Sequence, residues 1–317
     1  MFVALVKDDR EMWIIEEREV MEYFRKGFKD YYTTAQEEVS WKPPRFDQWH
    51  VHLSDAAKQS LDAMISTEEI KEALWPMKPY KAPSLDGLHV SFFQRFGLIV
   101  GDSMREEVER VFIERKIPEY LNKTHIVLIS KIRGPETIGN YRPINLCNSV
   151  YKIIVARIRL HLDTLVSPYQ TAFIPGRRGV DNSIIVQELI HTIGRAKGKK
   201  GFMSIKIDLE KAYDKIEWSF IKEMLINFNF PNNLIDLIMS CVTSVSTSLL
   251  FSGGYLEFFK PSKGIRQGDP LSPYPFILCM EFLGYLIEKK CAAKLWIPPS
   301  RRLEVARPSP ISFLRTI

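Results

Sequence analysis

The stretch that decides the fold of this chain is IKIDLEKAYD, residues 205–214. Its apolar residues Ile205 and Ile207 alternate with polar ones, which predicts a half-buried strand over 202–209. A helical pattern follows at once, so Asp208 is expected at the open edge of a sheet. A carboxylate in that position can hold a hard cation such as Mg²⁺, and it can equally serve as a helix cap.

A second informative stretch is GIRQGDPLSP, residues 264–273. It comes after a predicted hairpin, with strands at 247–251 and 255–259 joined through Ser-Gly-Gly. Its glycines allow the backbone to approach a ligand closely, and Arg266 and Gln267 offer donors to phosphates or bases. The alternative interpretation is an ordinary loop at the entry to a helix.

The rest of the chain predicts an α+β fold in which helices back a small sheet. A further strand is expected at 125–132. The Asp181 helix is expected to be buried through Ile184, Ile185, Leu189 and Ile193. The expected helices cover 11–32, a short segment opened by Ser66, 92–112, 150–165, 181–195, 221–228, 232–243 and 271–288.

Composition excludes several classes of protein. The chain has 317 residues, of which 45% are hydrophobic and 26% charged, so it is neither disordered nor membrane-spanning in composition. The N-terminus does not resemble a signal peptide, and we expect an intracellular protein, nuclear or cytoplasmic and not secreted. The four cysteines lie far apart, which predicts free thiols and no zinc site.

Positive charge is concentrated in the middle of the chain. Residues 120–215 contain 16 Lys and Arg against 7 Asp and Glu, a net charge of +9, whereas the whole chain carries +6. Such a region is typical of a surface that contacts a polyanion. A solvated basic face without a partner explains the charge alone equally well.

Several further motifs occur in a defined order along residues 75–290. They are KAPSLDG at 81–87, LISK at 128–131, NYRPI at 140–144 and YQTAFIPGRR at 169–178. Together with the two stretches quoted above, they resemble the reverse transcriptases of non-LTR (LINE-type) retrotransposons, most closely those of plants. Ser84 and Leu85 stand where the family has Gly and Pro.

The resemblance implies specific roles for residues near the centre of the chain. Asp208 falls on the first catalytic, metal-binding aspartate of the family. Tyr213 falls on the residue that screens against a 2′-hydroxyl on the incoming nucleotide. Gln267 and Gly268 fall on the loop that supports the nascent base pair.

The resemblance also implies the reaction and its partners. The family is an RNA-directed DNA polymerase that uses an RNA template, a DNA primer, deoxynucleoside triphosphates and two Mg²⁺ ions. Lys131 and Arg142 match basic residues that contact the triphosphate or the template. By family, the chain is therefore expected to be a nucleotidyltransferase.

The expected architecture is the fingers and a partial palm of a right-hand polymerase, an antiparallel sheet backed by helices, with the thumb missing. The domain ranges expected are a helical N-terminal extension at 1–75, a fingers-like part at 76–200, a partial palm at 201–291 and an aberrant tail at 292–317.

The second half of the metal site is not found in this sequence. The only acidic residues after Asp269 are Glu281, Glu288 and Glu304, and no Ala-Asp-Asp motif occurs there. We therefore expect a truncated, inactive chain. The alternatives are a non-catalytic nucleic-acid-binding remnant, whose binding would be salt-dependent, and a relative of group II intron maturases.

Overall fold

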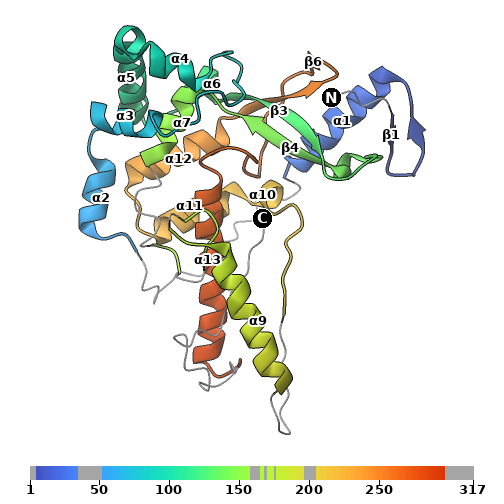
Figure 1. Cartoon of the computed structure of the whole chain (residues 1–317), viewed down its shortest axis with the longest axis vertical. Coiled ribbons are helices and arrows are strands. Elements are labelled where there is room, and N and C mark those ends of the chain that lie inside the picture. The colour runs from blue at the N-terminus through green and yellow to red at the C-terminus, as the bar shows by residue number, and fades with distance from the viewer. Residues whose placement is uncertain are drawn as a thin grey trace.

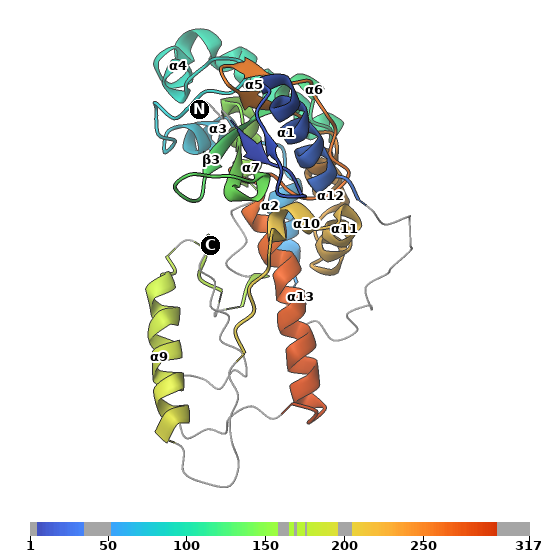
Figure 2. The same cartoon turned by 90° about the vertical axis from the view of Figure 1, so that its right-hand side faces the viewer.

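The computed structural model describes residues 5–34, 52–157, 165–167, 170–174, 176–195 and 205–296. A twisted sheet with α1 against it lies beside a group of helices, and α9 and α13 extend away from that body (Figures 1 and 2). The elements of the described residues are β1 (Val6–Lys7), β2 (Trp13–Ile14), α1 (Glu17–Tyr31), α2 (Asp55–Asp62), α3 (Thr67–Leu74), α4 (Val90–Arg95), α5 (Gly97–Glu114), α6 (Glu119–Asn122), β3 (Lys123–Ser130), the 3₁₀ turn η1 (Ile138–Asn140), β4 (Tyr141–Leu146), α7 (Ser149–Ala156), α9 (Gly179–Arg195), α10 (Ala212–Lys215), α11 (Trp218–Asn227), α12 (Asn232–Thr243), β5 (Ser246–Phe251), β6 (Gly254–Tyr255) and α13 (Pro273–Ala292).

The main sheet has the strand order β4-β3-β5-β6. Strand β3 pairs antiparallel with β4 and parallel with β5, so Ile126 lies between Asn145 and Leu249. Strands β5 and β6 form a hairpin around Ser252 and Gly253, both of which have positive φ, 47° and 85°. Two such residues give the tight turn that matches the twist of the flanking strands.

Helix α1 covers one face of this sheet. Its buried residues recur at helical spacing, and Phe24 and Phe28 reach a small core with the strands. The Phe24 ring lies 5.3 Å from Tyr141 of β4 and 5.2 Å from Phe251 of β5, measured between ring centroids. The N-terminal helix is therefore packed against the sheet directly.

A larger core joins the helices on the other side of the molecule. It contains buried residues of α3, α5, α7, α11, α12 and α13, with Tyr151 fully enclosed. Cys147, Cys241 and Cys279 are buried in it as free thiols, as the sequence predicts. No helix in the described part of the chain is long and apolar enough to cross a membrane.

Several predicted elements are confirmed. Ser66 caps α3 through a capping box, in which its hydroxyl accepts from the Glu69 amide at 3.1 Å and the Glu69 carboxylate accepts from the Ser66 amide at 2.8 Å. Strand β3 covers most of the strand predicted at 125–132, and the helix at 232–243 is present. The predicted hairpin is also present, but its second strand is Gly254–Tyr255 and not 255–259. The mixed helix-and-sheet class is confirmed with them.

Two predictions about sheet structure are wrong. The sheet is mixed and not antiparallel, because the long helical connection from β4 to β5 returns the chain parallel to β3. The strand predicted at 202–209 is absent from residues 205–209, which are exposed and pair with no described strand. Alternation alone does not make a strand where no partner supplies the hydrogen bonds. Residues 202–204 lie outside the described part.

Three helix predictions also need correction. The first helix begins at Glu17 and not at residue 11, because 6–14 form a short hairpin. The helix predicted at 92–112 is two helices that meet at Phe96. Helix α9 begins before Asp181 and is not buried as predicted, since Ile184 is 49% exposed and Ile185, Leu189 and Ile193 are only half-buried. For the helix predicted at 150–165, the described part contains α7, and residues 158–164 lie outside it.

Candidate functional site

The centre of the candidate site is the Asp214 carboxylate, which is only 5% exposed. It is carried on the short helix α10. The Tyr32 hydroxyl, at the end of α1, donates to Asp214 Oδ1 at 3.1 Å. The Gln267 side-chain amide donates to both carboxylate oxygens, at 3.3 and 3.4 Å. Three segments far apart in the sequence therefore meet at one buried charge.

Burial sets the ionisation of this cluster. It raises the pKa of Asp214, while hydrogen bonds from Tyr32 and Gln267 and the positive charges of Lys211 and Lys131 act in the opposite direction. Burial, and then the neighbouring Asp214 charge, raise the pKa of Tyr32 well above its ordinary value. The Tyr32 hydroxyl therefore remains a donor at every pH that the fold tolerates.

The loop at 264–268 is fixed against α10 by its backbone. The Gly264 amide donates to the Ile216 carbonyl at 2.8 Å, and the Trp218 indole donates to the Gly264 carbonyl at 2.7 Å. Gly264 has φ +79°, and a Cβ there would lie 2.8 Å from the Asp214 carbonyl oxygen. Only glycine allows this approach. The backbone it approaches is that of the protein and not that of a ligand.

The other side of the same loop pairs with strand β4. The Gln267 carbonyl accepts from the Asn145 backbone amide at 2.7 Å and from the Asn145 side chain at 3.3 Å. Gly268 has φ +89°, and a Cβ would lie 3.0 Å from the Asn145 carbonyl oxygen. The loop is thus held between α10 and β4, and Gln267 has a defined position between them.

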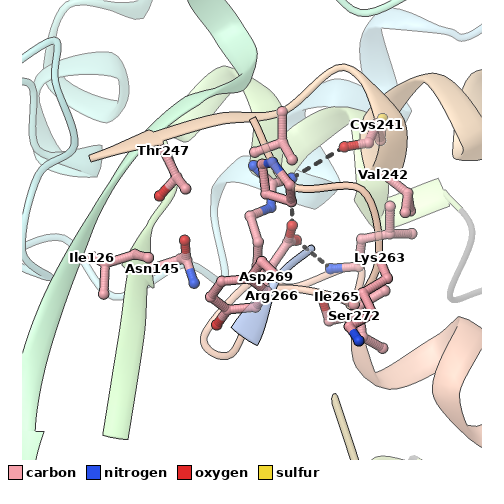
Figure 3. A pocket seen from close by; sticks show the side chains of 15 residues that line it. Ile126, Asn145, Cys241, Val242, Thr247, Lys263, Ile265, Arg266, Asp269 and Ser272 are labelled. Carbon is pink, nitrogen blue, oxygen red and sulfur yellow. Dashed lines mark hydrogen bonds and ion pairs between the residues drawn. The ribbon is translucent and has the colours of Figure 1, made fainter. Parts of the chain in front are cut away.

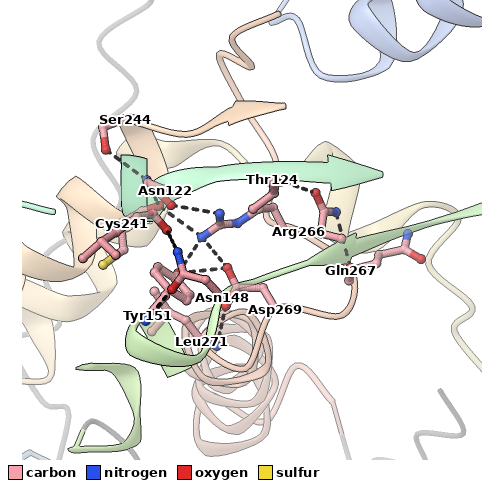
Figure 4. A network of polar contacts seen from close by, with 12 residues as sticks. Asn122, Thr124, Asn148, Tyr151, Cys241, Ser244, Arg266, Gln267, Asp269 and Leu271 are labelled. Atoms are coloured by element: carbon pink, nitrogen blue, oxygen red, sulfur yellow. Dashed lines mark hydrogen bonds and ion pairs between the residues drawn. The ribbon is translucent and has the colours of Figure 1, made fainter. Parts of the chain in front are cut away.

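A buried polar network anchors the end of this loop (Figure 4). The Arg266 guanidinium lies 2.5 Å from Asp269 and donates to the Tyr151 hydroxyl and, at 2.9 Å, to Asn122 Oδ1. Tyr151 in turn donates to Asp269 at 2.9 Å. Arg266 is 8% exposed. The prediction that its side chain offers donors to phosphates or bases is therefore wrong.

A cavity lies between this network and the sheet. In Figure 3, Thr247 and Asn145 face Arg266 and Asp269 across it. The Thr247 hydroxyl is buried and has no hydrogen-bond partner among the described residues. The Thr247 hydroxyl is therefore a buried polar group beside a cavity whose lining is mostly apolar.

Comparison with known proteins identifies the family. The model of the family described as "Reverse transcriptase (RNA-dependent DNA polymerase)" matches residues 129–301, more than half of the chain. The chain belongs to the reverse transcriptase family. The matched region contains β4, α10, the 264–268 loop and α13, and so all of the site except Tyr32 and Asn122.

Curated relatives place this reverse transcriptase among those of non-LTR, LINE-type elements, as the motifs indicate. It is 26% identical over 255 residues to the transposon TX1 uncharacterized 149 kDa protein of Xenopus laevis, covering 79% of this chain and 19% of that protein. It is 27% identical over 184 residues to the Pol polyprotein of the type-2 retrotransposable element R2DM of Drosophila melanogaster, covering 56% of this chain and 17% of that one. The chain therefore spans about a fifth of the length of these relatives.

The structure brings together three of the six residues predicted for the reverse transcriptase site, namely Tyr213, Gln267 and Gly268. Tyr213 is half-buried and stacks on Phe276 of α13, with ring centroids 4.6 Å apart. The loop that carries Gln267 and Gly268 is bonded to Tyr213 through its backbone. The Ile265 amide donates to the Tyr213 carbonyl at 2.8 Å. These contacts join the two motifs that the sequence analysis treats separately.

The two predicted basic residues lie at the edge of the site. Arg142 is exposed on β4, three residues before Asn145. Lys131 follows β3, is exposed, and donates through Nζ to the Gly139 carbonyl at 2.9 Å. Its charge reaches Asp214, whose pKa it helps to lower. Both side chains are therefore exposed, and that of Lys131 is held at the surface by the Gly139 carbonyl.

Asp208 does not occupy a metal site within the described residues. Its side chain is exposed, in a segment that is not a strand. The described part of the chain contains no group of three His, Cys, Asp or Glu side chains that could hold a metal ion. A pair of Mg²⁺ ions needs several carboxylate oxygens, so the described donor set does not fit it.

Sequence reasoning missed three residues of the site, since Asp214 itself was not among the predicted ones. Tyr32 lies in the N-terminal segment, where no chemistry was predicted, and Asn145 follows the NYRPI motif. A signal for Tyr32 exists in hindsight, because it continues the apolar stripe of α1 one turn past Phe28. No sequence pattern indicates that its hydroxyl reaches Asp214.

Ionisation of Asp214 makes stability depend on pH. Because its pKa is raised on folding, the folded state binds that proton more tightly than the unfolded state. Its contribution to stability is therefore greatest below the ordinary aspartate pKa and is lost as pH rises through the raised pKa. Urea denaturation between about pH 4 and about pH 7 should show the Asp214→Asn variant gaining stability relative to wild type as pH rises. A difference that stays constant, or moves the other way, would contradict this.

Proposed function

We propose that residues 129–296 form the nucleotide- and template-binding part of an RNA-directed DNA polymerase site. The observation that carries the proposal is the junction of Tyr213 and Gln267, which belong to two different motifs of the family. The Tyr213 carbonyl accepts from the amide of Ile265 in the Gln267 loop, and the Gln267 side chain donates to Asp214, the residue after Tyr213. In this proposal the Tyr213 ring bounds the sugar of an incoming deoxynucleotide, and Gln267 with Gly268 supports the base pair that forms.

The nucleotide end of the site has the rigidity that this role needs. Tyr213 is fixed by stacking on Phe276, and the Gln267 loop is held on both sides by backbone hydrogen bonds. A rigid wall beside the sugar can reject a 2′-hydroxyl by steric exclusion. Groups whose rotamers are fixed before binding lose little entropy when the nucleotide arrives, which favours discrimination between matched and mismatched bases.

Charge supports the same assignment. Lys131 and Arg142 are exposed beside the loop, and the segment from 120 to 215 has 16 basic and 7 acidic residues. We propose that Lys131 and Arg142 contact the triphosphate or the template backbone. Contacts of this kind bind phosphate without reading sequence, which suits a polymerase that must copy any template.

The metal chemistry is the part of the proposal that the described donors support least. Two Mg²⁺ ions would activate the primer 3′-hydroxyl and stabilise the leaving group in such a reaction. Asp208 is the residue we propose for the first of them. Since the described residues do not supply a full ligand set, we assign to this chain nucleotide and template positioning, and we derive no catalytic step.

Domain roles follow from the same proposal. The sheet with Lys131 and Arg142 would be fingers, and the segment from Asp208 to α13 would be part of the palm. The ranges expected from the sequence, 1–75, 76–200, 201–291 and 292–317, stay predictions in this scheme. The packing of α1 on the sheet supports treating the N-terminal helix as an integral part of the fingers.

The experiment that tests the proposal measures binding without turnover. An RNA template carrying a dideoxy-terminated DNA primer is bound to the chain in the presence of Mg²⁺, and its dissociation is followed by fluorescence. We expect the dNTP that matches the template base to slow dissociation, by about tenfold if it adds one or two good contacts. Mismatched dNTPs and matched ribonucleotides should have little effect.

Two variants sharpen this test. Gln267→Ala should weaken the effect of the matched dNTP, and Tyr213→Ala should let the matched ribonucleotide act. Lys222→Ala serves as the control, because Lys222 lies on α11 and our proposal gives it no role. Tight, salt-sensitive binding of the primed RNA without any discrimination among nucleotides would favour a non-catalytic nucleic-acid-binding protein instead.

A further inference from the structure

We propose that Asp214, held by Tyr32 of α1, is a positioning residue that determines which end of the Gln267 side-chain amide faces the incoming nucleotide. This inference rests on the function proposed above and deepens it. It assigns an orienting role to two residues that the sequence analysis did not single out for the site. It also makes the N-terminal helix part of the nucleotide site, although that helix lies outside the region matched by the family model.

The first argument is the chemistry of the contact. An ionised carboxylate has only acceptor atoms, whereas an amide has an NH₂ donor end and a carbonyl acceptor end. Gln267 Nε2 lies 3.3 and 3.4 Å from the two Asp214 oxygens. The NH₂ end must therefore face Asp214. The carbonyl oxygen, which accepts no hydrogen bond from the described residues, is left as an acceptor for a base or a sugar.

The second argument is that Asp214 is itself fixed by α1. Tyr32 is 4% exposed, donates its hydroxyl to Asp214, and stacks its ring on Phe259 at a centroid distance of 6.4 Å. The Tyr32 carbonyl accepts from the amides of Ser262 and Lys263, at 2.8 and 3.2 Å. One residue thus holds both the carboxylate and the chain that leads into the Gln267 loop.

A third contact ties α1 to the same segment. The Lys211 ammonium lies 3.6 Å from the centroid of the Tyr31 ring, in the residue before Tyr32. Lys211 has positive φ, 51°, in the turn just before α10. A non-glycine residue in that conformation is strained and persists only where its surroundings hold it. The end of α1 supplies such surroundings.

Protonation of Asp214 would reverse the orientation. A neutral carboxyl gains an O–H donor, which can bind the Gln267 carbonyl and leave the NH₂ end free. The titratable and charged groups that face Asp214 are Tyr32 from α1, Lys131 after β3, and Lys211 in its own segment. The raised pKa of Tyr32 keeps its hydroxyl protonated through the acid range, so a reorientation of Gln267 in acid would report on Asp214.

The orientation can be measured directly, independently of any activity. The chain has seven glutamines, so selective ¹⁵N-glutamine labelling gives a simple set of side-chain amide signals, and Gln267→Met identifies the pair that belongs to residue 267. Asp214→Asn and Tyr32→Phe should each shift that pair and reduce its protection from hydrogen exchange, by about tenfold or more for loss of a charge-assisted bond. Acid should shift it in wild type and not in Asp214→Asn.

Matched controls separate this effect from general loosening of the fold. Tyr23→Phe removes a hydroxyl on the same helix, where Tyr23 bonds the exposed Asp9. Asp236→Asn removes an exposed carboxylate on α12. Both should leave the Gln267 signals in place. Unchanged Gln267 signals in Tyr32→Phe and Asp214→Asn would overturn the inference.

The role in nucleotide selection is tested on the ternary complex with primed RNA. Both Asp214→Asn and Tyr32→Phe should reduce the advantage of the matched dNTP several-fold without changing the binding of primed RNA alone. Shifted Gln267 signals with an unaltered dNTP advantage would overturn the role in selection. If wild type shows no advantage for the matched dNTP, the proposed function fails, and the amide signals still decide whether Asp214 orients Gln267.

Discussion

Asp269→Ala is expected to lower the free energy of unfolding by about 3–5 kcal/mol, the cost typical of removing one partner from a buried ion pair. Asp269 lies 2.5 Å from Arg266, with 2% of the Asp269 side chain and 9% of the Arg266 side chain exposed. The substitution leaves the buried guanidinium charge with neutral partners, which among the described residues are Tyr151, Asn122 and the Cys241 carbonyl. Urea denaturation monitored by circular dichroism measures the change.

An exposed ion pair provides the control for this prediction. Lys215 and Glu210 lie 3.3 Å apart at the surface near the same site, and Glu210→Ala should change stability by less than about 1 kcal/mol. The paired replacement Arg266→Met with Asp269→Leu should recover much of the loss, because it removes both charges together. A loss from Asp269→Ala no larger than that from Glu210→Ala would show that the network does not anchor the loop.

Phe24→Ala is expected to cost about 3–5 kcal/mol, as large-to-small substitutions of buried aromatic residues do. Phe24 is fully buried between α1 and the sheet, where it contacts Phe28, Tyr141 and Phe251. Its loss leaves a cavity at the only aromatic cluster that joins α1 to β4 and β5 among the described residues. Because α1 carries Tyr32, the variant should also disturb the Asp214 contact. Denaturation and the Gln267 amide signals measure the two effects.

Phe96→Ala is the matched control, because Phe96 is 46% exposed at the junction of α4 and α5. It should cost less than about 1.5 kcal/mol and leave the Gln267 signals unchanged. If Phe24→Ala destabilised the chain no more than Phe96→Ala, α1 would not be an integral part of the sheet layer. In that case the inference about Tyr32 would lose its structural basis.

Sequence patterns predicted helices well where their ends carry chemical signals. Ser66, followed by acidic residues, indicated the start of α3, where the structure has a capping box with Glu69. Sequence patterns failed where a partner far away in the chain decides the structure. Residues 205–209 have the alternation of a strand without a described neighbour to pair with. The parallel pairing of β3 with β5 depends on how the intervening elements pack, and no local pattern encodes it.

In the candidate site too, sequence motifs predicted which segments belong together, and they did not predict the partners of individual side chains. Motif order predicted Tyr213, Gln267 and Gly268 for one site, and the structure places Tyr213 against the 264–268 loop. The charge on Arg266 suggested phosphate binding, yet its burial beside Asp269 makes it structural. The hydrogen bond from Tyr32 to Asp214 could not be predicted from the sequence, because it depends on the angle at which α1 crosses the sheet. Side-chain partners from distant segments are set by packing and not by local sequence.

The central claim is that the junction of Tyr213 with the Gln267 loop binds the incoming nucleotide of an RNA-directed DNA polymerase. The most direct test is cross-linking with a photoreactive dNTP on a primed RNA template, followed by mass spectrometry of the peptides. We predict cross-links within 205–216 and 263–270, present only when the dNTP matches the template base. Cross-links elsewhere in the chain, or the same yield with a mismatched template base, would contradict the account.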